Sequence, residues 1–497
     1  MTVPRPRIVV TLPARGVDEA LAQARLARDQ GADAAEVRVD RLSREERARL
    51  ERLFPPPLPL VATYRSRAEG GEGEDEGAAR GEVLLELAAL PFRWIDLELD
   101  RDLGLLPRLP APESLGRIVS SHVPDASPGG WKERLGRLEE VDGVGKLVVR
   151  ATVSELLREL VPQAERVGTE VVIHTTGPSG PLLRAWARRF GFPLVYAALP
   201  STTGSPRVEP SQIEVDRLRP FLEADESPPL FAVCGRPIGH SQSPTLHTSW
   251  MREQGRPGLY VALEFQDDQE FVDALGPLAE GGFLGLNVTH PFKDVAAEAA
   301  SELGAGARTC GAANCLTFRQ GGILAENTDL LAILRRMEEL RASGHWDGRS
   351  LAVVGAGGAA RATLAAAREL GARAVVYARR SDAAREAAQR FGAEVGRATH
   401  GSPTSLVVHA TDVGRAGTSG LDVPIGPLLV AGAHVLDWVY MPGSPVVRAA
   451  AEAASATYED GWRLLVYQAA ASYAIWWGDG PSEASVDRLI SEGPCPG

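Results

Sequence analysis

The stretch SLAVVGAGGAARATLAAAREL (residues 350–370) joins an apolar run, a glycine-rich turn and an alanine-rich segment. Gly355, Gly357 and Ala360 fit the spacing G-x-G-x-x-G/A directly after the apolar run. Because such a turn lacks bulky side chains, backbone amides and a helix N-terminus approach a pyrophosphate closely there. A second apolar run, RAVVYARR (373–380), follows the expected helix. Strand, turn, helix and strand are thus in the order of a dinucleotide-binding unit.

The residues that end this second run indicate which dinucleotide the unit binds. Arg379 and Arg380 stand where an NAD site carries an acidic residue for the ribose 2′-hydroxyl. Two cations suit a 2′-phosphate, so the sequence predicts NADP as the cofactor. Two alternatives stay open: a turn that serves only helix–strand packing, and two solvated arginines at the start of a loop. The residues expected here at the cofactor are Gly355, Ala356, Gly357, Gly358, Ala359, Arg379 and Arg380.

Eight further apolar runs precede residue 200 and alternate with helix-like segments rich in Ala, Leu, Arg and Glu. This alternation is typical of α/β proteins with parallel sheets, and eight strands predict a closed (β/α)₈ barrel. The acidic, glycine-rich stretch 69–82 is expected to form a mobile loop. The eight runs are RIVVTL (7–12), AAEVRVD (34–40), LPLVATYR (58–65), RWIDLEL (93–99), RIVSSH (117–122), GKLVVRA (145–151), EVVIHT (170–175) and PLVYAAL (193–199).

Polar residues end several of these runs, and barrels of this kind carry their chemistry at the C-terminal ends of the strands. Lys146 and His122 belong to neighbouring strands, so we expect them at the same mouth. A lysine that attacks a ketone forms an imine, and a histidine then removes a proton from the adjacent carbon. Taken singly, a histidine at a strand end is more often structural. The polar residues at the strand ends are Glu36, Arg38, Arg65, Glu98, His122 and Lys146.

The chain between residues 230 and 335 carries two further candidates for proton transfer. Lys293 ends the string GLNVTHPFK (285–293), and Asp329 lies in ENTDL (326–330). Reduction of a ketone needs a donor that protonates the forming alkoxide, and a lysine held by a carboxylate suits that role. Either residue alone is most often a surface charge.

The surrounding strings resemble shikimate dehydrogenase, in the order of that family: GRPIGHSQSPTLH (235–247), NVTHPFK (287–293), GAANCLTF (311–318), ENTD (326–329), GAGGAARA (355–362), DWVYMP (437–442) and GWRLLVYQA (461–469). The resemblance implies that Lys293 and Asp329 form the catalytic pair. It also implies that Ser241 and Ser243 hold a substrate carboxylate. The residues implied to bind ring hydroxyls are Asn287, Thr289, Asn314, Tyr440 and Gln468, and Thr411 is implied at the cofactor.

Three departures from that family concern its cofactor and catalytic motifs. Leu330 follows the Asp where the family usually has Gly, and residues 409–412 read His-Ala-Thr-Asp in place of Asn-Ala-Thr-Pro. Residues 378–380 read Ala-Arg-Arg in place of Asn-Arg-Thr. We expect these changes to affect cofactor affinity more than the reaction.

The first half resembles type I 3-dehydroquinate dehydratase through EVRVD (36–40), ATYRSRAEGG (62–71), IDLEL (95–99), SSH (120–122), GKLVV (145–149) and PLLR (181–184). The resemblance implies that Lys146 is the Schiff-base lysine, that His122 transfers the proton and that Glu98 orients His122. Val123 and Val208 replace the usual Asp and Ser, which makes an impaired dehydratase conceivable. The residues implied to contact the substrate are Glu36, Arg38, Arg65, Arg184 and Gln212.

Fusion of the two halves in this order resembles the bifunctional dehydroquinate dehydratase/shikimate dehydrogenases, in which the second half reduces the ketone made by the first. Two alternatives are a single-activity shikimate or quinate dehydrogenase with a degenerate barrel, and a non-catalytic metabolite sensor. The expected domains are the barrel (1–222), an acidic, Pro-containing linker (223–229), a substrate domain (230–335) completed by helices at about 460–497, and a Rossmann domain (345–459).

Composition narrows the classes of partner. The 497-residue chain carries 53 Lys and Arg against 65 Asp and Glu, a net charge of −12, which disfavours nucleic acid and membranes and favours small-molecule substrates. The four cysteines have neither disulfide nor metal-ligand spacing, so we expect no metal and a reducing cytoplasm. No run is long enough for a signal peptide or a membrane span. The cysteines are Cys234, Cys310, Cys315 and Cys495.

Overall fold

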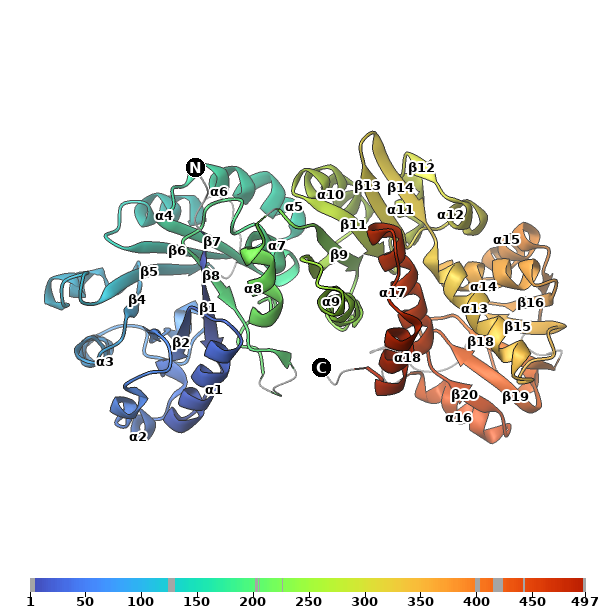
Figure 1. Ribbon diagram of the computed structural model, residues 1–497, viewed down its shortest axis with the longest axis horizontal. Helices are drawn as coiled ribbons and strands as arrows, with labels where there is room; N and C mark the ends of the chain where they lie inside the picture. The colour runs from blue at the N-terminus through green and yellow to red at the C-terminus, as the bar shows by residue number, and fades with distance from the viewer. Residues whose placement is uncertain are drawn as a thin grey trace. The chain divides into compact units, whose positions relative to one another are not determined.

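The computed structural model describes residues 5–123, 130–201, 204, 206–225, 227–397, 403–413, 423–440 and 443–494 (Figure 1). Two compact units are present: residues 1–230 with 256–282, and residues 231–255 with 283–496. Cys495, the last three residues of the expected C-terminal helices, residues 441–442 of the DWVYMP string and residue 226 of the expected linker lie outside the described chain. The functional domain boundaries given above remain our proposal.

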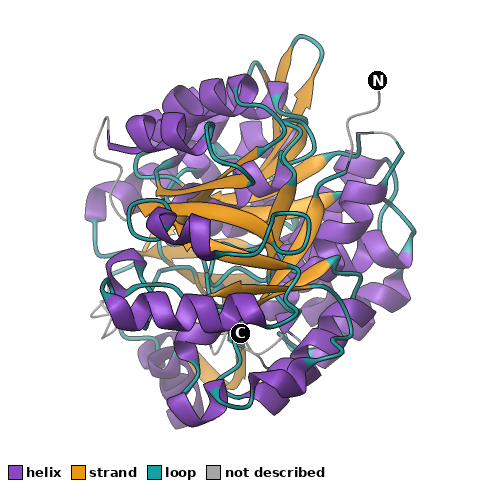
Figure 2. Cartoon of the chain, turned by 90° about the vertical axis from the view of Figure 1, so that its left-hand side faces the viewer, coloured by secondary structure: helices purple, strands orange, loops and turns teal. Residues whose placement is uncertain are grey.

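An eight-stranded parallel sheet forms the first unit, and helices surround its strands (Figure 2). Each of the eight predicted runs overlaps one strand, which confirms the α/β barrel. The strand order is β7-β6-β5-β4-β3-β2-β1-β8. Ladders link every neighbouring pair in this order, whereas the described residues of β7 and β8 form none, so the barrel is nearly closed. The strands are β1 (Arg7–Leu12), β2 (Ala34–Arg38), β3 (Leu60–Thr63), β4 (Trp94–Glu98), β5 (Gly116–Val123), β6 (Val144–Arg150), β7 (Val171–Thr176) and β8 (Leu194–Ala197).

Helices follow most of these strands. The segment 69–82, predicted as a loop, differs in the structure because its end belongs to a helix that begins at Ala78. Alanines and leucines at 78–89 favour that helix despite the glycine at position 81. The helices are α1 (Val17–Asp29), α2 (Arg44–Arg47), α3 (Ala78–Ala89), α4 (Gly130–Leu138), α5 (Val153–Glu155), α6 (Val161–Arg166), α7 (Gly180–Ala185) and α8 (Val215–Glu223).

The barrel interior is layered by residue type. An apolar cluster contains Val9, Ala34, Val61, Ile118 and Leu194. Side chains two residues further along a strand point to the same side, so the next inward layer lies toward the C-terminal strand ends. That layer is mostly polar and contains Thr11, Glu36, Thr63, Ser120 and Tyr196, with Lys146 following Val144. The apolar layer therefore supports a polar cavity at the mouth where the sequence predicts chemistry.

A mixed six-stranded sheet follows the barrel, in the order β10-β9-β11-β13-β14-β12. Its strands are β9 (Leu230–Gly235), β10 (Leu259–Glu264), β11 (Phe283–Val288), β12 (Glu302–Leu303), β13 (Cys315–Arg319) and β14 (Gly322–Glu326). The helices of this part are α9 (Ser243–Glu253), α10 (Asp268–Glu280), α11 (Lys293–Glu298), α12 (Ala305–Cys310) and α13 (Thr328–Ala342).

The third sheet is parallel and has the order β17-β16-β15-β18-β19-β20. This is the 3-2-1-4-5-6 order of a dinucleotide-binding Rossmann sheet, which confirms the prediction from the glycine-rich turn. Its strands are β15 (Ser350–Val354), β16 (Arg373–Tyr377), β17 (Glu394–Val395), β18 (Thr404–His409), β19 (Leu429–Asp437) and β20 (Thr457–Glu459). The remaining helices are α14 (Gly358–Glu369), α15 (Ser381–Phe391), α16 (Pro445–Ala453), α17 (Trp462–Trp477) and α18 (Glu483–Glu492).

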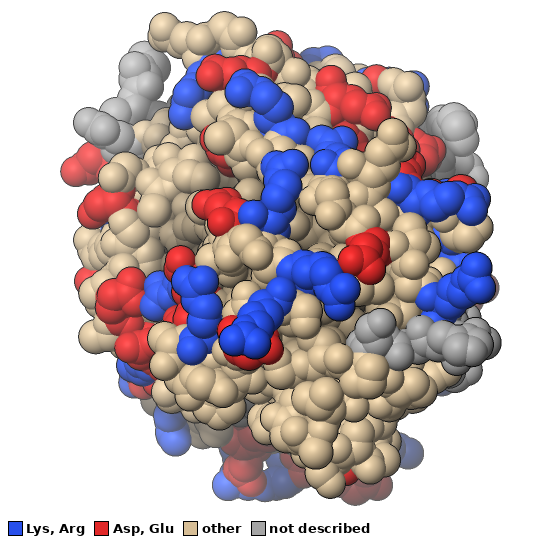
Figure 3. Space-filling model, turned by 90° about the vertical axis from the view of Figure 1, so that its right-hand side faces the viewer, with Lys and Arg blue, Asp and Glu red and all other residues tan. Residues whose placement is uncertain are grey.

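Two surface properties bear on partners. None of the described helices is long and apolar enough to span a bilayer. On the face drawn in Figure 3, basic and acidic side chains are interspersed among the described residues. Such mixing does not favour a nucleic-acid backbone, which needs a basic field.

Candidate active sites

Lys146 lies in a cavity of about 260 Å³ at the C-terminal ends of the barrel strands. Its side chain is almost fully buried, and Nζ lies 2.6 Å from Asp96 Oδ2 and 3.8 Å from Glu36 Oε1. The same nitrogen lies 4.4 Å from the centre of the Tyr196 ring. Two carboxylates and an aromatic face therefore hold the amine at the cavity floor.

Arg65 connects the charged groups around this lysine. Its guanidinium donates to Asp96 Oδ1 at 2.9 Å and to Ser120 Oγ at 2.8 Å. Burial opposes the ionisation of Asp96, but the positive charges of Arg65 and Lys146 outweigh burial and hold the pKa of Asp96 well below its usual range. Asp96 is consequently a permanent anion that pairs with both cations.

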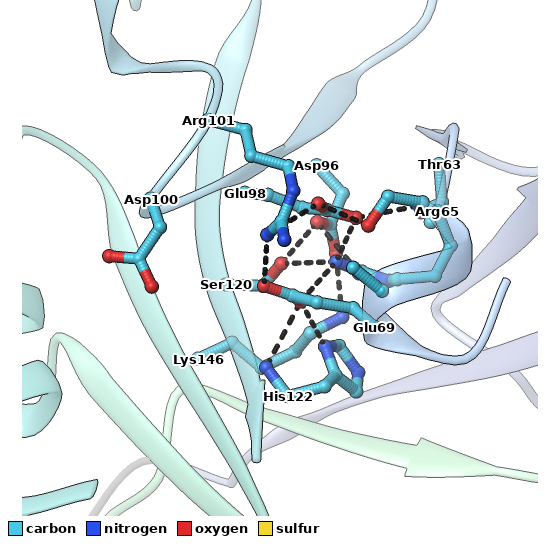
Figure 4. Close-up of polar contacts among 12 residues, drawn as sticks. Thr63, Arg65, Glu69, Asp96, Glu98, Asp100, Arg101, Ser120, His122 and Lys146 are labelled. Atoms are coloured by element: carbon cyan, nitrogen blue, oxygen red, sulfur yellow. Dashed lines mark hydrogen bonds and ion pairs between the residues drawn. The ribbon is translucent and has the colours of Figure 1, made fainter. Parts of the chain in front are cut away.

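His122 lies beside Lys146 on the neighbouring strand (Figure 4). Its Nδ1 is 3.1 Å from Glu69 Oε2, and that oxygen also accepts the His122 backbone N–H at 3.0 Å. Burial of the ring and the positive charges of Arg65 and Lys146 lower the pKa of His122 well below its usual value. The imidazole is therefore neutral at pH 7 and available to accept a proton.

The carboxylate that holds His122 is Glu69, whereas the resemblance to type I dehydratases implied Glu98 for this contact. Glu98 instead accepts the Ser66 backbone N–H at 2.8 Å and the Ser66 hydroxyl at 2.7 Å, and lies 3.3 Å from Arg65. Glu69 was missed because it lies on the loop after β3. Its signal was an acidic residue four positions after the strand-end Arg65, and the two side chains lie 3.2 Å apart.

Four further residues predicted at this site line the same cavity: Glu36, Arg38, Arg184 and Gln212. Arg38 forms a two-point ion pair with Asp40 at 2.9 and 2.8 Å. Arg184 donates to the carbonyls of Thr175 (2.7 Å) and Tyr196 (3.3 Å), and burial lowers its pKa to about 10. These four residues therefore line one cavity together with Arg65, His122 and Lys146. Glu98, the remaining residue predicted for the barrel site, lies behind Arg65.

The second unit contains a cavity of about 370 Å³ that Lys293 and Asp329 both line. Lys293 is the first residue of α11, and Asp329 lies in the first turn of α13. Lys293 Nζ is 2.5 Å from Asp329 Oδ2. Asn327 accepts the Leu330 backbone N–H at 3.0 Å and so caps the helix that presents the aspartate. The predicted lysine–carboxylate pair is therefore present in the geometry of a hydrogen-bonded ion pair.

Amide and hydroxyl groups surround this pair. Asn314 Nδ2 donates to Asp329 Oδ1 at 2.9 Å and lies 3.4 Å from Gln468 Oε1. Asn287 Nδ2 donates to Ser472 Oγ at 2.8 Å. A cavity lined by oriented amides and hydroxyls suits a ligand with several hydroxyl groups. Every predicted substrate contact of this half lines the cavity: Ser241, Ser243, Asn287, Thr289, Asn314, Tyr440 and Gln468.

The glycine-rich turn borders the same cavity through Gly357, Gly358 and Ala359. Gly355 has φ +127°, and a Cβ placed there would lie 2.4 Å from the Ala410 carbonyl oxygen, so only glycine is accommodated. Helix α14 begins at Gly358 and points its N-terminus into the turn. The close backbone packing at Gly355 and the N-terminus of α14 together suit the binding of a pyrophosphate.

Four predicted cofactor residues lie away from that cavity's lining, namely Gly355, Ala356, Arg379 and Arg380. Both arginines follow β16, and Arg380 lies 3.3 Å from Asp382 with both side chains largely exposed. Thr411 does line the cavity. Its hydroxyl lies 2.6 Å from His409 Nε2, and His409 Nδ1 lies 2.8 Å from Asp437. The motifs predict no role for this buried pair behind Thr411.

The described residues contain no group of three His, Cys, Asp or Glu side chains placed to hold a metal ion.

Comparison with known proteins assigns both halves. Residues 8–228 match the model of type I 3-dehydroquinase, and residues 233–316 match that of the shikimate dehydrogenase substrate binding domain. The shikimate dehydrogenase (NADP(+)) of Ruegeria sp. (strain TM1040) is 36% identical over 273 residues, which are 52% of this chain and 96% of that protein. The chain belongs to the shikimate dehydrogenase family, and a type I 3-dehydroquinase domain precedes that part.

Two more distant matches cover both halves of the chain. The bifunctional 3-dehydroquinate dehydratase/shikimate dehydrogenase, chloroplastic, of Arabidopsis thaliana is 26% identical over 500 residues, covering 95% of this chain and 82% of that protein. The solved structure of the dehydroquinate dehydratase and shikimate dehydrogenase from S. pombe AroM covers 98% of both chains at 23% identity, with a TM-score of 0.43.

Two departures from these families line the barrel cavity, and a third lies next to Asp329 in the sequence. Val123 and Val208 line the barrel cavity, and each presents an apolar side chain where the dehydratases usually carry a polar one. Leu330 is buried at the start of α13, directly after the Asp329 of the shikimate dehydrogenase half. Beside these substitutions, Lys146 still pairs with Asp96 and Lys293 with Asp329.

Proposed function

We propose that this chain converts 3-dehydroquinate to 3-dehydroshikimate in its barrel and reduces 3-dehydroshikimate to shikimate in its second unit with NADPH. The observation that carries the proposal is the pair of sites in one chain: Lys146 beside neutral His122, and Lys293 bonded to Asp329. The Arabidopsis thaliana relative carries both activities in its name, and the Ruegeria relative of the second half is named for NADP(+).

In the barrel, the Lys146 amine adds to the ketone carbon, and loss of water gives a protonated imine. His122 takes a proton from the carbon next to the imine carbon. It then gives that proton to the hydroxyl on the following carbon, which leaves as water while the ring double bond forms. Hydrolysis of the imine consumes one water and releases the enone. Glu69 keeps the His122 ring in position throughout.

In the second unit, Lys293 donates a proton to the oxygen of the ketone as the carbonyl becomes an alcohol, and Asp329 holds Lys293 in place. NADPH, when bound at the glycine-rich turn, supplies the hydride. Asn314 fixes Asp329, while Ser241 and Ser243 bind the substrate carboxylate. The exposed Arg379 and Arg380 bind the 2′-phosphate of the cofactor.

The test supplies the purified chain with 3-dehydroquinate and NADPH and follows enone absorbance together with NADPH oxidation. Lys146→Met is expected to abolish turnover of 3-dehydroquinate and the borohydride-trapped adduct while sparing the reduction of added 3-dehydroshikimate. Lys293→Met is expected to do the reverse, so that enone accumulates. A wild-type chain that reduces 3-dehydroshikimate but forms no adduct would be a single-activity dehydrogenase, and one that binds without turnover would be a sensor.

We also propose that the chain acts on these small molecules in a reducing cytoplasm, without nucleic-acid or membrane partners. Buried, unpaired Cys234, Cys310 and Cys315 support a reducing setting. Fractionation of cells that express the natural chain tests this location.

A further inference from the structure

A second imidazole lies in the barrel cavity. His174 on β7 is 1% exposed and lines the same cavity as Lys146. The strand register places His122, Val148 and His174 opposite one another on β5, β6 and β7. Two histidines therefore flank the strand of the reactive lysine at one height, and the mechanism above uses only one of them.

One nitrogen of the His174 ring already accepts a hydrogen bond from the protein. His174 Nε2 accepts the backbone N–H of Tyr196 at 3.2 Å. This bond crosses the seam between β7 and β8, where the described strands form no ladder. Arg184 donates to carbonyls on both sides of the same seam, those of Thr175 and Tyr196. Side chains thus supply part of the bonding that a closed barrel takes from its backbone.

The hydrogen bond to Nε2 determines the tautomer of the His174 ring. A neutral imidazole whose Nε2 accepts a hydrogen bond carries its proton on Nδ1. Burial, followed by the charges of Arg184 and Lys146, lowers the pKa of His174 well below its usual value, and a contact with the Ile173 backbone opposes this without offsetting it. His174 Nδ1–H is consequently a fixed, uncharged donor.

By distance and angle this donor has no hydrogen-bond partner in the described chain, although the Ile173 backbone lies close enough to affect the pKa of the ring. The Tyr196 hydroxyl and Gln212 Oε1 likewise have none, and both residues line the same cavity. Burial raises the pKa of Tyr196 well above its usual value, so its hydroxyl stays protonated. Buried polar atoms without partners are rare in folded proteins, so a cluster of three at one cavity indicates atoms that a ligand satisfies.

The cluster differs in character from the charged groups of the cavity. Arg65, Lys146 and Asp96 pair with one another, whereas the β7–β8 side offers two neutral donors and one neutral acceptor. Alcohol groups both donate and accept, so ring hydroxyls match such a set and an anion does not.

We propose that His174 is a substrate-binding residue of the barrel reaction, whose Nδ1–H donates to a ring hydroxyl of the bound polyhydroxylated substrate. The inference rests on the proposed dehydratase function. It gives His174 two separable roles, a structural one through Nε2 and a recognition role through Nδ1. His174 takes no part in proton transfer because the ring stays neutral and its basic nitrogen is occupied by the Tyr196 N–H.

Two substitutions separate the roles. His174→Gln places an acceptor near the position of Nε2 and removes the donor at Nδ1, whereas His174→Asn keeps an N–H near Nδ1 and loses the seam acceptor. We expect His174→Gln to raise the KM for 3-dehydroquinate about tenfold, the effect of one lost neutral hydrogen bond, with the midpoint of urea inactivation unchanged. We expect His174→Asn to lower that midpoint and to keep the KM within about twofold of wild type. Reduction of 3-dehydroshikimate by the same chains is the internal control.

The outcomes distinguish this inference from the proposed function. If the borohydride adduct forms in wild type but His174→Gln leaves KM unchanged, or if KM follows the loss of stability in both variants, His174 is structural only and the inference is wrong. If the wild-type chain forms no adduct, the proposed dehydratase function itself fails.

Discussion

His122 Nδ1 lies 3.1 Å from a Glu69 carboxylate oxygen that also accepts the His122 backbone N–H. One carboxylate therefore fixes both the backbone and the ring of the residue that transfers the proton. Glu69 lies on the loop after β3, and Gly71 beside it packs so closely on the Arg65 carbonyl that a Cβ would lie 2.1 Å from the oxygen. The loop is thus shaped to bring Glu69 over the cavity.

Glu69→Gln is expected to lower kcat of the dehydratase about tenfold with little change in KM, because the ring loses its orienting partner while the substrate contacts remain. Steady-state kinetics with 3-dehydroquinate measure this split. Glu72→Gln is the matched control, since Glu72 lies on the same loop with its half-exposed carboxylate on the surface residue Arg15. Equal effects of the two variants would contradict the role given to Glu69.

The residues that sequence reasoning located and those it missed differ in where they lie. Lys146 and His122 point inward because side chains alternate along a strand, so their place follows from the strand pattern alone. Glu69 belongs to a loop, whose path depends on close glycine packing that no periodicity encodes. His174 lies inside a strand run, where its ring could have been ordinary core, and only the open β7–β8 seam gives it a bond.

The second site likewise contains residues that the sequence pattern locates and residues that it does not. Asn327, Thr328 and Asp329 form a recognisable helix start, so the placement of Asp329 at an N-terminus could be predicted. The seam of the barrel and the His409–Asp437 pair depend on which strands become neighbours. Such contacts join residues far apart in the chain, and one sequence carries no direct signal for them.

The lowered pKa of His122 sets the acid limb of the dehydratase. A proton acceptor must be neutral, and burial together with Arg65 and Lys146 shifts the ionisation of His122 below its ordinary value of 6.5. We therefore expect kcat/KM for 3-dehydroquinate to stay level as pH falls through 6.5 and to decline only at lower pH. A profile of kcat/KM from pH 5 to 8 measures the limb. An acid limb above pH 6.5 would show that the ring is stabilised in its charged form.

The Lys293–Asp329 pair is expected to control proton delivery rather than binding. Lys293→Met should lower kcat for reduction of 3-dehydroshikimate at least about 100-fold, the usual scale for loss of a general acid. Asp329→Asn should have a smaller effect, because Lys293 stays in the site as the proton donor and loses only the carboxylate that holds it. NADPH binding, followed by fluorescence, should remain near wild type in both variants. Loss of NADPH binding in Lys293→Met would point to a folding defect at the glycine-rich turn.

Arg379 and Arg380 are expected to set the preference for NADPH over NADH. A 2′-phosphate gives each guanidinium a charge-assisted hydrogen bond that the free ribose hydroxyl does not offer. The double variant Arg379→Ala/Arg380→Ala should raise the KM for NADPH about 10- to 100-fold, since two such contacts are removed, and leave the KM for NADH nearly unchanged. Arg373→Ala is the matched control, because Arg373 is exposed at the other end of the same strand and pairs with Glu394. A parallel rise in KM for both cofactors would indicate that the arginines shape the loop and do not read the phosphate.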